Sequence, residues 1–215
     1  MPVESACTAY LGNMLRVVRL RCPAFTGVRA MATNPYPPPP PGRGATADLC
    51  DIHIKEPVDT IVEGSGVQIM QSIFRDYGKR TRFSGQVSTV KCHESNPRVR
   101  AALEEEGQGR VLVVDAGGSQ RCAVLGDNLA AMGARNGWAG VVVNGCIRDS
   151  EDIAGMEIGV KALNTHPLKS SKRDPGLRDV PVVVAGTLVT PGDWLYADRD
   201  GILVAPYELS MDGDK

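Results

Sequence analysis

The sequence predicts an α/β protein whose central strands run parallel, and three observations support this. Two almost wholly apolar segments, VLVVD at 111–115 and GVVVN at 140–144, have the composition of buried strands. A helix-like segment lies between them, and another precedes the first. The resulting order of strand, helix and strand is typical of βαβ units.

The N-terminal elements of the folded part follow from local patterns. Thr46 has the character of a helix N-cap, so a helix is expected from Thr46 to about His53. Alternation and β-branched residues predict a strand within 81–91, FSGQVSTVK. Pro97 suits the first turn of a helix, which a glutamate-rich stretch continues to Glu106.

The remaining elements alternate and then become rich in strands. The expected succession is a strand at 110–114, a helix at 124–136 and a strand at 139–143. Short apolar segments separated by Gly, Pro or Asp predict further strands at 158–163, 180–184, 187–189, 194–197 and 202–205. The polar segment 164–180 is expected to be a long surface excursion.

Bulk composition argues against several classes of function. The length of 215 residues fits one domain plus a tail, and a net charge of −1 gives no general attraction for nucleic acid. The six cysteines form no C-x-x-C pair, so we expect a reducing compartment without a zinc site or disulfide framework. No apolar run approaches the roughly twenty residues needed to cross a bilayer, so we expect no membrane association.

Residues 1–45 differ in composition from the rest and are expected to be a disordered leader. Residues 1–30 hold four arginines and a single acid, which is typical of an organelle transit peptide. An unstructured extension, or a start at Met31, is the alternative. The proline run 37–41 is expected to be an extended spacer, with binding to a proline-recognising module as its alternative. We therefore expect a folded domain over residues 46–215 and a cytoplasmic or mitochondrial location.

Two polar sets near the apolar strands form the candidate site. The first set lies ahead of the second apolar strand and consists of Gly126, Asp127, Asn128 and Leu129. The second set, Arg148 and Asp149, follows that strand, and twenty residues lie between Asp127 and Arg148. This gap holds a helix and a returning strand, so the two sets are expected to meet at one sheet edge.

The chemistry of these residue types points to a small acid bound beside a metal. A guanidinium such as that of Arg148 pairs bidentately with a carboxylate. The neighbouring carboxylate of Asp149 is a hard ligand for a divalent ion that keeps most of its waters. Backbone N–H groups after Gly126 can face an anion as well. The sequence therefore predicts a pocket for a carboxylic acid chelated to a metal.

A family resemblance rests on six motifs spread over residues 46–210. They are TADLCD, FSGQVSTVKC, VLVVDAGGS, LGDNLA, GVVVNGCIRD and PGDWLYADRDGILVAP. With these motifs the chain resembles the family of the regulator of ribonuclease activity A, which includes class II 4-hydroxy-4-methyl-2-oxoglutarate aldolases and oxaloacetate decarboxylases. The aldolases are marked by Asp, a gap of twenty residues and Arg-Asp, which here are Asp127, Arg148 and Asp149. Ribonuclease-regulating members lack the full set.

The resemblance implies a swivelling β/β/α domain, with a central mixed sheet flanked by helices, in a homotrimer with sites near subunit interfaces. It implies a lyase that cleaves 4-hydroxy-4-methyl-2-oxoglutarate to two pyruvates and decarboxylates oxaloacetate. Asp149 would ligate Mg²⁺ or Mn²⁺, Asp127 would hold water, and Arg148 would grip the 2-oxo acid. Backbone groups from Gly126 to Leu129 would hold its other oxygens. The alternative is a non-catalytic regulator that binds and inhibits a ribonuclease.

Simpler structural explanations exist for several features. Asp127 alone would suit a helix N-cap, and Arg148 with Asp149 alone would suit a surface ion pair. The AGGS segment at 116–119 matches neither phosphate-binding glycine pattern, so we expect a tight turn serving a small anion. Found together at the family's spacing, Asp127, Arg148 and Asp149 favour the functional interpretation.

The remaining polar and sulfur residues are expected to be structural. The three histidines share no metal-ligand spacing and are His53, His93 and His166. Asp198 and Asp200 precede Gly201, and a β-turn with this glycine at positive φ explains them better than a calcium site. Cys122 and Cys146 are expected to be buried packing residues.

Overall fold

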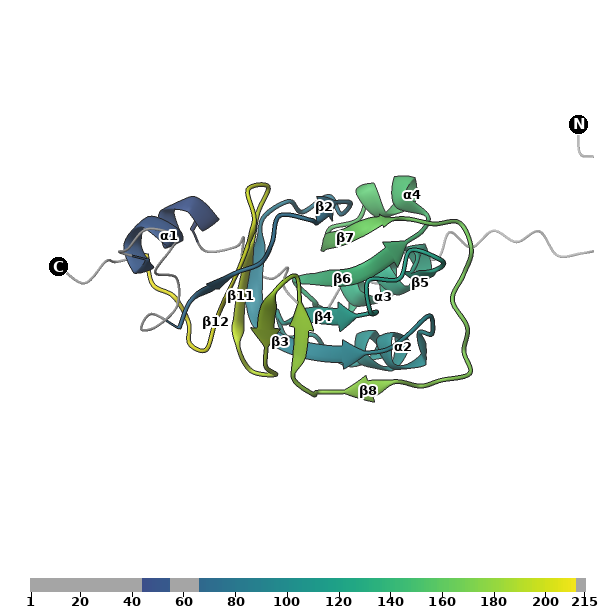
Figure 1. Cartoon of the computed structure of the whole chain (residues 1–215). Coiled ribbons are helices and arrows are strands. Elements are labelled where there is room, and N and C mark those ends of the chain that lie inside the picture. The colour runs from purple at the N-terminus through teal and green to yellow at the C-terminus, as the bar shows by residue number, and fades with distance from the viewer. Residues whose placement is uncertain (1–43, 55–65, 212–215) are drawn as a thin grey trace, which may run out of the picture. The chain divides into compact units, whose positions relative to one another are not determined.

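A mixed sheet forms the centre of the computed structural model, which describes residues 44–54 and 66–211 (Figure 1). Within these residues the sheet has ten strands, and a separate antiparallel pair makes a second sheet. The larger sheet contains β1 (Gln68–Ile69), β2 (Arg75–Asp76), β3 (Phe83–Lys91), β4 (Val111–Asp115), β5 (Ala123–Leu125), β6 (Gly140–Ile147), β7 (Gly159–Thr165), β8 (Leu177–Arg178), β11 (Trp194–Ala197) and β12 (Ile202–Ala205). The pair contains β9 (Val182–Val184) and β10 (Thr187–Val189). This is the mixed α/β fold that the sequence predicts.

Four helices accompany the sheet within the described residues. They are α1 (Thr46–His53), α2 (Pro97–Glu104), α3 (Asp127–Arg135) and α4 (Ser150–Ala154). Apolar side chains of α2, α3 and α4 pack with one face of the sheet in a core that includes Trp138. The opposite face packs against the β9–β10 hairpin and strands β11 and β12. No described helix is long and apolar enough to cross a membrane.

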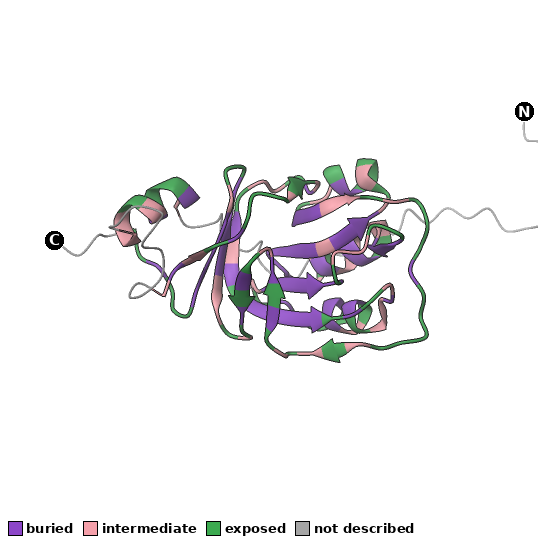
Figure 2. Cartoon of the chain, in the orientation of Figure 1, coloured by how far each residue is buried: buried purple, intermediate pink, exposed green. Residues whose placement is uncertain are grey.

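The four central strands β3, β4, β6 and β7 lie side by side and parallel, as the βαβ order predicts. Both faces of these strands are covered, so every residue of β4 is buried (Figure 2). Antiparallel strands flank them, with β11 beside β3 and β2 beside β7. The parallel arrangement brings the carboxyl ends of β3, β4 and β6 to one edge, where polar residues follow.

One packing relationship explains two glycines in the central strands. The ring of Phe83 lies across β6 and β7, where a Cβ at Gly140 or Gly159 would come within 2.4 and 2.1 Å of its carbons. Glycine is needed there because the aromatic ring fills the space that a side chain would take. Phe83 is 1% exposed, so the ring anchors the core on this side.

The N-terminal helix has the bounds predicted, but its start is held differently. Ala45 is the N-cap and makes no side-chain hydrogen bond, whereas Thr46 is already helical. Both the backbone N–H and the Oγ1 hydroxyl of Thr46 donate to the carboxylate of Asp198, at 2.7 Å each. The prediction of Thr46 as the N-cap was therefore wrong, because a carboxylate distant in sequence takes over the capping role.

The predicted helix at 124–136 was wrong at its start. Residues 123–125 form β5, which pairs with the end of β6, and α3 begins only at Asp127. The second helix also ends earlier than Glu106, because the side-chain amide of Asn136 donates to the carbonyls of Leu103 and Glu104. Tertiary contacts set both boundaries.

Several short elements of the structure differ from the prediction. Strands β1 and β2, of two residues each, and helix α4, of five residues, were not predicted. The segment 164–180 is mostly exposed, as expected, but it contains β8 and a buried Ser170.

Gly201 does not have positive φ, so that part of the turn prediction was wrong. The Asp198 carboxylate closes this turn instead, accepting the N–H groups of Asp200 and Gly201. The expected leader, residues 1–45, lies outside the described residues except for its last two positions.

Candidate active site

The two polar sets identified in the sequence meet where β5 and β6 end. Arg148 follows β6, and its backbone N–H donates to the carbonyl of Leu125, the last residue of β5, at 3.0 Å. The backbone N–H of Asp127, which opens α3, donates to Oδ2 of Asp149 at 3.3 Å. Strand pairing thus places Gly126 and Asp127 directly against Arg148 and Asp149.

Arg148 and Asp149 form an ion pair at this edge. The guanidinium Nε lies 3.2 Å from Oδ2 of Asp149, and the side chains are 36% and 33% exposed. Such an exposed pair contributes little to stability. Within the described residues, the second oxygen of Asp149, Oδ1, accepts no hydrogen bond. The pair therefore presents one engaged and one available carboxylate oxygen.

The backbone conformation of Asp149 is left-handed, with φ 56° and ψ 40°. Residues other than glycine rarely adopt this conformation, and Asp and Asn tolerate it best. Asp149 is also the N-cap residue of α4, and its carbonyl accepts the N–H of Ile153 at 3.1 Å. The side chain of Asp149 makes no capping hydrogen bond to α4. Its carboxylate instead accepts the N–H of Asp127 at the start of α3.

The start of α3 has its own hydrogen bonds. The carbonyl of Gly126 accepts the N–H groups of Leu129 and Ala130, at 3.1 and 3.0 Å. The side-chain amide of Asn128 donates to Oδ1 of Asp127 at 2.9 Å. Leu129 is 6% exposed and packs in the core. Leu129 thus serves packing in this structure, while Asp127 and Asn128 face outward.

The donors at this edge fit a hydrated divalent ion. In the part of the chain that the structure describes, no group of three or more His, Cys, Asp or Glu could enclose a metal. The available oxygen of Asp149, with Asp127 nearby, matches Mg²⁺, which keeps several waters and takes one or two carboxylates. A four-ligand zinc site does not fit these residues.

The glycine turn after β4 is tight, as predicted. Gly117 and Gly118 both have positive φ, 68° and 71°. Oδ1 of Asp115 accepts the N–H of Gly117 and the side-chain amide of Asn144, each at 3.0 Å. These internal hydrogen bonds account for the turn, and its use for an anion stays a prediction.

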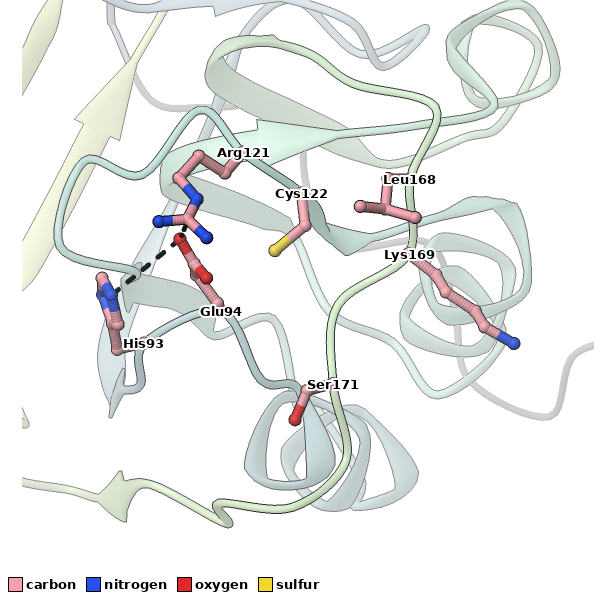
Figure 3. Close-up of a pocket in the computed structure, with 7 residues that line it drawn as sticks. All are labelled: His93, Glu94, Arg121, Cys122, Leu168, Lys169 and Ser171. Atoms are coloured by element: carbon pink, nitrogen blue, oxygen red, sulfur yellow. Dashed lines mark ion pairs between the residues drawn. The ribbon is translucent and has the colours of Figure 1, made fainter.

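A second group of polar residues, missed in the sequence, forms a pocket of about 390 Å³ (Figure 3). Its lining comes from three separate segments and comprises His93, Glu94, Arg121, Cys122, Leu168, Lys169 and Ser171. Glu94 accepts a hydrogen bond from Ser119 Oγ at 2.9 Å and pairs with Nε of Arg121 at 3.3 Å. Arg121 and Cys122 precede β5 and Gly126 follows it, so this three-residue strand, about 10 Å long, separates the pocket from the ion pair.

Two of the three histidines make structural contacts, as expected, whereas His93 and Cys122 line the pocket described above. His53 contacts the Ser210 carbonyl and His166 accepts the N–H of Leu168, so the two serve different segments. Cys122 and Cys146 are buried, 6% and 1% exposed. Burial, reinforced by nearby Asp115, raises the pKa of the Cys92 thiol to about 12, so this thiol is neutral at physiological pH.

Comparisons with known sequences agree with the motifs. A family model described as RraA-like, Aldolase/RraA, matches residues 46–204. A protein of Alkalilimnicola ehrlichii named "Putative 4-hydroxy-4-methyl-2-oxoglutarate aldolase" is 58% identical over 164 residues, covering 76% of this chain and 96% of its own. A Burkholderia mallei protein of the same name is 52% identical over 161 residues, covering 75% of this chain and 94% of its own.

Solved structures share the fold. The RNA-processing inhibitor RraA from "Thermus thermophilis" superimposes with a TM-score of 0.70 at 43% identity, covering 78% of this chain and 95% of that one. A Geobacillus kaustophilus structure named as an S-adenosylmethionine: 2-dimethylmenaquinone methyltransferase has a TM-score of 0.70 at 44% identity, covering 77% and 97%. The names of these similar proteins describe three activities, so the residues of the site must discriminate among them.

Proposed function

The chain belongs to the RraA-like family, and on this premise we propose that it is a divalent-metal-dependent carbon–carbon lyase. Its substrate would be 4-hydroxy-4-methyl-2-oxoglutarate, cleaved to two pyruvates, with oxaloacetate decarboxylation as a second activity. The observation that carries this proposal is the contact of Asp127 and Arg148 with a single carboxylate oxygen of Asp149. An inhibitor of a ribonuclease needs no such arrangement, whereas a metal-assisted lyase needs a carboxylate held in place for its ion.

Asp149 would hold the ion, Mg²⁺ or Mn²⁺, through the oxygen that accepts no hydrogen bond among the described residues. When bound, the ion would supply positive charge against the charge that develops on the 2-oxo oxygen as the carbon–carbon bond breaks. The remaining ligands would be waters and substrate oxygens, with Asp127 as a further carboxylate nearby.

Arg148 would bind the substrate carboxylate. Its Nε faces Asp149, so the terminal N–H groups of the guanidinium fork are the ones suited to two parallel hydrogen bonds with an acid. The same charge offsets negative charge on the reacting 2-oxo group. Loss of the planar fork would thus affect both binding and turnover.

Asp127 would position the water that delivers a proton to the methyl carbon of the pyruvate product. Its Oδ1 is oriented by the side-chain amide of Asn128, and it lies at the helix start beside the ion pair. A carboxylate so placed can hold a water without contacting the carbon itself. No lysine lies in this motif, so a Schiff-base route has no basis here.

A regulator that binds and inhibits a ribonuclease is the second candidate function. The similarity to the RNA-processing inhibitor structure favours it. Assembly as a homotrimer, with sites near subunit interfaces, and a cytoplasmic or mitochondrial location also belong to the proposal.

Pyruvate release separates the two candidates. Pyruvate would be followed with lactate dehydrogenase, using 4-hydroxy-4-methyl-2-oxoglutarate and oxaloacetate with Mg²⁺, and inhibition of a ribonuclease would be measured in parallel. The lyase proposal predicts turnover of both acids and loss of turnover in Asp149→Asn. Ribonuclease inhibition that survives this substitution, without pyruvate release from the unaltered protein, would establish the regulator instead.

A further inference from the structure

Building on the proposed function, we propose that Gly126 is a positioning residue. The absence of a side chain at Gly126 lets the Asp149 carboxylate and the Arg148 guanidinium lie against the backbone at the start of α3. There they form the pair that receives the metal ion and the acid. Gly126 thus acts through Arg148 and Asp149, and its role is steric.

Distances around Gly126 carry this inference. A Cβ placed on Gly126 would lie 2.8 Å from Oδ2 of Asp149, 3.1 Å from Nε of Arg148 and 3.2 Å from Cγ of Arg148. The first distance is shorter than real Cβ contacts allow, and the other two are tighter than most. Any side chain at this position would displace the charged ends of the pair.

Backbone conformation does not explain the glycine. Gly126 has φ −136° and ψ −177°, which is extended backbone that any residue adopts. It is also the N-cap of α3, a position where Ser, Asp or Asn would ordinarily add a stabilising hydrogen bond. Here the Asp149 carboxylate accepts the N–H of Asp127 instead. The glycine therefore gives up a local cap and leaves room for a distant carboxylate.

The displaced groups can move without unfolding the chain. Both side chains are about one third exposed, so a methyl group at position 126 would push them toward solvent rather than into the core. The substitution Gly126→Ala should consequently alter ligand binding more than stability. If the glycine were needed only for folding, the substitution would lower stability more than it alters ligand binding.

The matched control is Gly201→Ala. A Cβ at Gly201 would meet nothing within 4 Å, and Gly201 does not have positive φ. Both variants thus make the same chemical change, one against the charged pair and one into open space. Metal-free preparations of the full chain and the two variants would be titrated with Mn²⁺ by calorimetry, and their melting temperatures and kinetics with oxaloacetate compared.

We expect Mn²⁺ affinity to fall about tenfold or more in Gly126→Ala, in line with losses of orienting contacts around metal ligands. Gly201→Ala should match the unaltered protein, and the metal-free melting temperatures of all three should agree within about 2 °C. Raising Mn²⁺ should recover part of kcat in Gly126→Ala while KM stays high, because Arg148 remains displaced.

Two results would contradict the role of Gly126 but leave the proposed function intact. One is a Gly126→Ala variant with unchanged Mn²⁺ affinity and KM. The other is a variant whose melting temperature falls steeply along with its activity, because that would mark a glycine needed for folding. If the unaltered protein itself neither binds Mn²⁺ nor releases pyruvate, the proposed function fails and this inference fails with it.

Discussion

The backbone N–H of Asp127 donates a hydrogen bond to the Asp149 carboxylate, although the two residues lie 22 positions apart. The contact places a negative charge at the N-terminus of α3, where the helix dipole and its N–H groups favour an anion. It engages the same oxygen that faces Arg148. The helix start and the ion pair therefore hold Asp149 in one orientation, which the site needs if Asp149 is a metal ligand.

Asp149→Asn removes the proposed metal ligand with little change of shape. Asn tolerates the left-handed backbone at this position, but a neutral amide is a poor ligand for a hard ion. We expect metal affinity and turnover to fall together, by on the order of a hundredfold if the ion contributes about 3 kcal/mol. Calorimetry and pyruvate release measure the two effects. The exposed Asp152→Asn is the control, and wild-type turnover of Asp149→Asn at sub-saturating Mg²⁺ would exclude Asp149 as the ligand.

Arg148→Lys keeps the charge but removes the planar fork. We expect KM for the 2-oxo acid to rise and kcat to fall, by roughly tenfold or more in kcat/KM if one charge-assisted hydrogen bond is lost. Folding should be unaffected because lysine keeps the charge and the side chain is partly exposed. Arg135→Lys, at the exposed end of α3, is the matched control. Unchanged kinetics would mean that Arg148 does not contact the substrate.

The buried Cys92 thiol should make stability depend on alkaline pH. Burial raises its pKa from 9.0 to about 12 in the folded protein, so the unfolded chain loses this proton first as pH rises. The stabilising effect is fully present below about pH 9 and is lost progressively between pH 9 and 12. Urea unfolding would give the free energy of unfolding at pH 7 and at pH 10.5. Between these pH values the unaltered protein should lose about 1 to 2 kcal/mol more of this free energy than Cys92→Ala does. Equal losses in the two proteins would contradict the raised pKa.

Deletion of residues 1–42 tests the domain boundary. The basic segment and the proline run have too little apolar periodicity to join a core, so fold, assembly and lyase activity should all survive the truncation. Circular dichroism, size-exclusion chromatography and pyruvate release would follow the three properties. An insoluble or inactive product would show that these residues belong to the folded structure.

Strongly patterned elements could be predicted from sequence, and contact-dependent ones could not. Strand 202–205 and helix Thr46–His53 have the predicted bounds, and the strand follows from its local apolar pattern. Strand β5 was missed because its three apolar residues fit a helix equally well until the pairing with β6 is known. The capping of Thr46 by Asp198 depends on a contact across 152 positions, which no local pattern reveals.

The candidate site also has features that could be predicted from the sequence and features that could not. Its strand-end location and the meeting of Asp127 with Arg148 and Asp149 followed from the βαβ order and the twenty-residue gap. The left-handed backbone of Asp149 and the steric role of Gly126 depend on three-dimensional distances. The pocket that includes Glu94 and Arg121 was missed because its residues come from three segments that carry no shared motif.

The dependence of turnover on a divalent ion tests the proposed lyase most directly. Pyruvate release from oxaloacetate would be followed in excess chelator and again after addition of Mg²⁺ or Mn²⁺. We predict that the chelator abolishes turnover and that either ion restores it, because the ion held by Asp149 would provide the main positive charge against the developing negative charge. Full turnover in excess chelator would contradict the metal-dependent mechanism.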